Sequence, residues 1–138
     1  MNKRTLLRIG AISAVLGTLI LVGAQASHPT GGPDPVDHEV TFQDFADSTN
    51  WELVHLGSWF GVLLITIGLV VLYHSLSDGP GSEFGRLGYA IVLVGAAMFT
   101  VWMALDTVVV KQVDVAWVNA PPRRESSSLS GSGSYSGA

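Results

Sequence analysis

The sequence contains no cysteine among its 138 residues. Disulfide bonds, thiolate metal sites and cysteine nucleophiles are therefore excluded, although this absence does not identify the cellular compartment. Charged side chains are also scarce, at 13% of residues, where an ordinary soluble domain has about 25%. No patch of basic residues interleaved with aromatic residues occurs, so we expect no nucleic-acid binding. No phosphate-binding loop, catalytic triad, paired-carboxylate site or zinc motif occurs either, and we expect a protein that is not an enzyme and uses no cofactor.

What the sequence has instead is three long apolar runs, within a composition that is 48% hydrophobic. The central run, residues 53–73, carries no charged side chain apart from a neutral histidine, His55. As a helix it would be about 31 Å long, which matches the hydrocarbon core of a bilayer at about 30 Å. A soluble helix of this length would need a polar face, and this run has none. We therefore predict a membrane-spanning helix over 53–73 and, on the same grounds, another over 87–105.

The first apolar run follows Lys3, Arg4 and Arg8 and has two interpretations. It could be a cleaved secretory signal, because residues 24–26 read Ala-Gln-Ala, a small-x-small cleavage pattern. It could equally be a retained membrane helix over 6–26, which is long enough to span. We favour the retained helix, because a stripe of small residues on one helical face suits packing against a neighbouring helix. This stripe consists of Gly10, Ser13, Ala14 and Gly17.

The connections between the runs predict how the chain is threaded. Residues 27–50 are rich in proline, glycine and acidic side chains and contain no Lys or Arg. About a dozen residues join the second and third runs, so these two helices are expected to form an antiparallel hairpin. Because basic residues favour the cytoplasmic side, we predict a cytoplasmic N-terminus, an external acidic loop and a location in the cell (inner) membrane. The predicted fold class is all-α, with one membrane domain over 1–122 and a disordered Ser/Gly-rich tail over 123–138.

Several short motifs occur in a characteristic order along residues 5–122. They are His28-Pro29, WELVHLG at 51–57, Leu72-Tyr73, GRLG at 85–88, Leu105-Asp106 and VDVAW at 113–117. This order resembles a group of uncharacterised prokaryotic multi-pass membrane proteins that carry a polytopic domain of unknown function. The resemblance implies a membrane fold but no activity and no site residue. Members of that group continue into further membrane helices, so we expect this chain to be a C-terminally truncated member. That the tail after Pro122 is not native is a hypothesis.

Two residues near the membrane ends, His55 and Asp106, are weak functional candidates. His55 and His74 would lie about 28 Å apart on one helix, so they cannot ligate the same haem iron. Haem ligation is then restricted to an oligomer in which His55 pairs with its own copy. Asp106 ends the third span, where a solvated or interface-paired carboxylate is the favoured interpretation and a proton or ion relay is the alternative.

Two further patterns bear on metal binding and on helix packing. Asp34, Asp37, His38 and Glu39 do not follow the spacing of a calcium-binding loop, and a solvated acidic loop is the better interpretation. Gly57 and Gly61 form a Gly-x-x-x-Gly packing motif, whose partner is the first helix, the third helix or another copy.

The leading prediction is a structural membrane bundle, or a fragment of a larger bundle, whose partners are the lipid bilayer and either other membrane helices or copies of itself. The first alternative is a transport or channel component that uses Asp106 and the acidic first loop. The second alternative is a membrane redox subunit that ligates haem through His55 in an oligomer.

Overall fold

The computed structural model describes residues 2–30, 37–76, 79 and 82–121, and these residues form helices and no strands. The elements are α1 (Lys3–Ala26), α2 (His38–Asp47), α3 (Trp51–Leu76), α4 (Ser82–Leu105), the π-helical turn η1 (Asp106–Val110) and α5 (Lys111–Val118). Three helical segments are long and apolar enough to cross a bilayer: α1, α3 and the continuous segment Ser82–Val118. The predicted all-α, multi-pass membrane fold is thus confirmed. The predicted tail over 123–138 lies outside the described residues.

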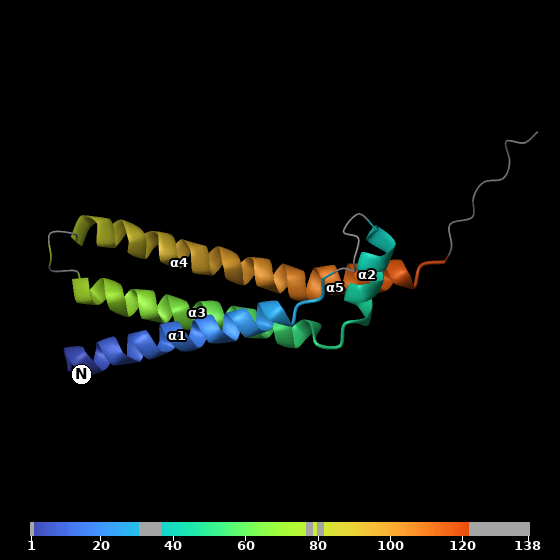
Figure 1. The fold of residues 1–138 in the computed structure, drawn as a ribbon. Helices are drawn as coiled ribbons and strands as arrows, with labels where there is room; N and C mark the ends of the chain where they lie inside the picture. Colours follow the sequence, from blue (N-terminus) through green and yellow to red (C-terminus); the bar gives the residue numbers. More distant parts are fainter. Residues whose placement is uncertain (1, 31–36, 77–78, 80–81, 122–138) are drawn as a thin grey trace, which may run out of the picture.

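The three predicted spans fall inside α1, α3 and α4, and α3 and α4 form the predicted antiparallel hairpin. In Figure 1 α3 lies between α1 and α4, and the N-terminus lies at the same end of the bundle as the α3–α4 connection. The segment from Ser82 to Val118 has 37 residues, or about 55 Å of helix. This length exceeds a bilayer core of about 30 Å. Its last part, η1 and α5, therefore continues beyond the span of 87–105.

α1 and α3 pack with their backbones in contact, through glycines on both helices. A Cβ atom added to Gly17 would lie 2.5 Å from the Gly61 carbonyl oxygen, and one added to Gly61 would lie 2.8 Å from the Gly17 oxygen. About two helical turns further along α3, a Cβ on Gly68 would lie 2.8 Å from the Gly10 oxygen and 2.7 Å from the Cβ of Ala14. Only small residues permit such an approach of two helices. The sequence left three possible partners for Gly61, and the structure places this residue against α1.

Gly57, the other half of the packing motif, lies at the edge of the same interface, where an added Cβ would be 3.4 Å from the Cβ of Ala24. α4 is packed quite differently. None of its residues is buried, and a Cβ added to Gly88 or Gly95 would meet no atom within 4 Å. The bundle is therefore a tight α1–α3 pair with a more loosely packed third helix.

α2 and α5 form a cap at the end of the bundle opposite the α3–α4 connection (Figure 1). Asp37 directly precedes α2, and its side chain accepts hydrogen bonds from the amides of Glu39 and Val40, as an N-cap residue does. The rings of Phe42 in α2 and Trp117 in α5 lie 4.9 Å apart. The acidic first loop therefore contains a helix that packs on the extension of the third span.

Candidate functional site

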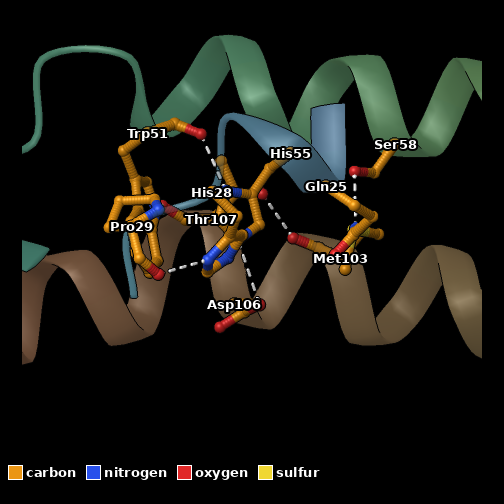
Figure 2. Close-up of polar contacts among 9 residues, drawn as sticks. All are labelled: Gln25, His28, Pro29, Trp51, His55, Ser58, Met103, Asp106 and Thr107. Atoms are coloured by element: carbon orange, nitrogen blue, oxygen red, sulfur yellow. Dashed lines mark hydrogen bonds and ion pairs between the residues drawn. The ribbon is translucent and has the colours of Figure 1, made fainter. Parts of the chain in front are cut away.

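A polar cluster lies where α4 passes into η1, between the three spans and the cap (Figure 2). It brings together residues from three separate parts of the chain: His28 just after α1, Trp51 and His55 in the first turns of α3, and Asp106 and Thr107 in η1. The sequence singled out His55 and Asp106 individually as candidates. The structure makes them a pair.

The His55 imidazole is 2% exposed and both of its ring nitrogens have a partner. Nδ1 lies 2.7 Å from the backbone oxygen of Trp51, and Nε2 lies 3.0 Å from Oδ2 of Asp106. A carbonyl oxygen can only accept a hydrogen bond, so Nδ1 carries a proton and donates a hydrogen bond to the backbone oxygen of Trp51. One further proton must then lie between Nε2 and Oδ2, on the imidazole or on the carboxyl group. In either arrangement His55 and Asp106 together have no net charge.

Two successive residues of the π-helical turn η1 contact α3. Asp106 directs its carboxylate to His55, while the backbone oxygen of Thr107 accepts a hydrogen bond of 3.2 Å from the indole Nε1 of Trp51. A π-turn adds one residue to a helical turn, and such turns are frequent at functional sites. The Thr107 hydroxyl donates to the backbone oxygen of Met103 and remains within its own helix.

Aromatic rings pack against His55. The His28 ring lies 5.2 Å from the His55 ring and 5.7 Å from the Trp51 ring, and its Nδ1 is 2.8 Å from the Pro29 backbone oxygen. Trp51 and His55 lie 4.3 Å apart, one helical turn from each other. His28 entered the sequence analysis only as part of a motif. Its position directly after the first span, at the level where the second begins, is the signal that could have placed it here.

Lys111 links the cluster to the cap. Its Nζ atom donates hydrogen bonds to the backbone oxygens of Phe45, Ala46 and Ser48, at 2.7, 2.8 and 2.9 Å. These are carbonyl groups at the C-terminal end of α2, where a helix has no internal donors and carries partial negative charge. The same ammonium group lies 5.9 Å from the centre of the Trp51 ring, within the range of a cation–π contact.

Asp114 is a buried acid, one turn beyond Lys111 in α5. It is 2% exposed, and its Oδ2 atom has no hydrogen-bond partner among the described residues. The residue lies nine positions past the end of the 87–105 span, in the cap. Burial raises the pKa of its carboxyl group above 3.8, Lys111 acts to lower it, and the charge of Asp106 raises it further. The i, i+3 spacing of Lys111 and Asp114 alone would predict an exposed ion pair on the helix surface, but Asp114 is buried.

The structure also places the other candidate residues. His74 lies at the opposite end of α3 from His55, beside the rings of Tyr73 and Tyr89. Of the acidic first loop, Asp34 lies outside the described residues, Asp37 caps α2, and the His38 ring stacks on Phe42. Within the described ranges no three His, Asp or Glu side chains are grouped as metal ligands would be. Haem ligation by Nε2 of His55 would require Asp106 to give up its contact with that atom.

No protein-family model matches the chain, and comparisons with curated proteins and with solved structures find no significant similarity.

Proposed function

We propose that this chain is a non-catalytic structural component of the cell membrane, whose three spans form a bundle or part of a larger bundle. The observation that carries the proposal is that the donor groups of Trp51, His55 and Lys111 form their hydrogen bonds within the protein. An ammonium group has three protons, and Lys111 donates to three backbone oxygens. Both ring nitrogens of His55 and the indole N–H of Trp51 are likewise engaged. Such a cluster fastens the cap and the third span to α3 and leaves these donors no capacity for a substrate.

We further propose that the N-terminus is cytoplasmic and the α2–α5 cap is external. Lys3, Arg4 and Arg8 lie at the same end of the bundle as Arg86, while the other end carries the acidic loop. Lys111 is the basic residue of the cap within the described chain, and its charge is taken up by the end of α2. This distribution fits the excess of basic residues that cytoplasmic loops carry. The order of motifs further supports a relationship to the group of prokaryotic multi-pass proteins named above.

The absence of cysteine makes the topology directly testable with single-cysteine variants. Thr49→Cys places a thiol in the exposed connection before α3, and Glu83→Cys places one at the opposite end of the bundle. We expect a membrane-impermeant maleimide to label the first variant in intact cells and the second only after permeabilisation. The reverse pattern would overturn the orientation, and release of the protein by alkaline carbonate would overturn the membrane assignment itself.

A second function, a component of a proton-coupled transporter, is favoured by one observation. The proton between Nε2 of His55 and Oδ2 of Asp106 can reside on either residue, and ionisable pairs near a membrane often act in proton relays. A cavity of about 280 Å³ between α3 and α4 also has His55 in its wall. Reconstituted vesicles separate the two functions. The structural proposal predicts equal proton flux for the wild type and Asp106→Asn, whereas a wild-type flux that Asp106→Asn abolishes would establish transport.

A further inference from the structure

A cleft of about 500 Å³ lies between α3 and α4 at the end of the bundle that carries their connection. Its walls contain only apolar side chains, aromatic rings and glycines. The lining includes Leu72, Tyr73, Gly85, Gly88 and Tyr89. Sites for small molecules in proteins have volumes of about 300–1,000 Å³ and predominantly apolar walls. The cleft therefore has the size and the lining of a ligand site.

Two glycines on α4 shape this space in different ways. A Cβ added to Gly88 would meet no atom within 4 Å, so nothing from α3 fills the position in front of it. Gly85 has the opposite role, because a Cβ there would lie 3.3 Å from the Tyr73 ring. Tyr73 can thus lie against α4 and stack on Tyr89, with ring centres 4.7 Å apart and planes inclined by 16°. The stacked tyrosines join the two helices at one level while Gly88 leaves the adjoining space empty.

The nearest cation along α4 is Arg86, which follows the cleft residue Gly85 directly but does not itself line the cleft. Its side chain is 66% exposed. It donates one hydrogen bond of 3.2 Å to Glu83, which is itself 80% exposed. Ion pairs between such exposed groups are weak, and a guanidinium group has five N–H donors in a geometry that fits phosphate oxygens. Arg86 can therefore exchange its contact with Glu83 for one with a phosphate group.

We propose that the cleft binds one acyl chain of an anionic phospholipid, with the lipid phosphate held by Arg86. A hydrocarbon chain matches walls that carry no charge, and the exposed cation next to Gly85 matches the head group. The basic residues of α1 lie at the same end of the bundle (Figure 1), which makes this end attractive to anionic lipid. The inference goes beyond the structural role proposed above, because it assigns a ligand and a site for it.

The decisive comparison uses two glycines of α4 that differ in one respect. Gly88 and Gly95 both have open space at the Cβ position, but only Gly88 lines the cleft. The full-length protein, delipidated in detergent, is titrated with phosphatidylglycerol or with phosphatidylcholine carrying the same oleoyl chains, and bound lipid is counted by native mass spectrometry. We expect the wild type and Gly95→Leu to retain one phosphatidylglycerol. Gly88→Leu should weaken its retention by about tenfold or more, since leucine occupies the space of the chain.

Arg86→Gln tests the head-group contact without changing the packing of the cleft. We expect this variant to lose the preference for phosphatidylglycerol over phosphatidylcholine. The proposal is overturned if Gly88→Leu and Gly95→Leu retain lipid equally, or if the wild type holds both lipids equally well, as unspecific surrounding lipid would be held. If Gly88→Leu does not fold, the lipid preference of Arg86→Gln decides alone: a preference equal to that of the wild type overturns the proposal.

Discussion

Gly17 of α1 and Gly61 of α3 face each other so closely that the space of a methyl group on either is already occupied by the backbone of the other. The contact fixes how the first two spans pack, since a side chain at either position would force the helices apart. It also gives the small residues of α1 a role that a cleaved signal would not need.

The first prediction follows from this contact. Gly61→Ala should lower the stability of the protein by about 1–3 kcal/mol, the usual cost of overpacking a closely packed site. The clash is with the Gly17 oxygen and with the Cβ of Leu21 at 2.9 Å, neither of which is a flexible chain end. Gly95→Ala is the control, because its methyl group would meet nothing, and we expect an unchanged melting temperature. Thermal unfolding in detergent, followed by circular dichroism, measures both. Equal melting temperatures for the two variants would contradict the observed α1–α3 packing.

The second prediction concerns the His55–Asp106 pair. His55→Ala leaves the Asp106 carboxyl group without its partner and should cost about 1–3 kcal/mol. Asp106→Asn should cost less, because the asparagine amide can still donate to an Nε2 atom that carries no proton. In a double-mutant cycle with Asp106→Ala, the two truncations should therefore be less costly together than the sum of the single changes. Thermal unfolding of the four proteins measures the coupling, and additive effects would show that the two side chains do not interact.

Apolar run length predicted the three spans, because a bilayer sets a minimum length and excludes charge along it. Gly57 and Gly61 also predicted close packing, but the motif alone did not identify the partner, since any helix with a small-residue face would fit. The site was less accessible from the sequence. His28, His55 and Asp106 are separated by long stretches of chain, and their meeting depends on the relative height of three helices. The π-turn at 106–110, which brings Asp106 and Thr107 to one side, has no sequence pattern that would predict it.

The third prediction concerns Lys111 and the cap. Lys111→Met keeps the apolar stem of the side chain and removes the ammonium group that binds three backbone oxygens at the end of α2. Hydrogen bonds from a charged donor contribute about 1.5–3 kcal/mol, so we expect α2 to separate from α5 more often. Amide hydrogen exchange should accelerate in α2 by tenfold or more, about what 1.4 kcal/mol produces, and remain unchanged in α1 and α3. Lys3→Met is the matched control, since Lys3 lies at the far end of α1. Unchanged exchange in α2 would show that the lysine does not hold the cap.

The fourth prediction concerns pH and Asp114. Burial raises the pKa of this carboxyl group in the folded cap above its ordinary value of 3.8. The folded cap therefore binds more protons than the opened cap does, and the contribution of Asp114 to stability decreases as the pH rises above about 4. Asp114→Asn removes the ionisable group and leaves an amide of similar shape. The amides of α2 should exchange more slowly in this variant than in the wild type near pH 7, and the opening of its cap should depend less on pH.

Asp47→Asn is the control, because it removes an equal charge from an exposed position. It should leave the pH dependence of α2 exchange as it is in the wild type. The burial of this acid would be contradicted if the wild-type cap and the Asp114→Asn cap both became more stable as the pH rose from about 4 to about 7.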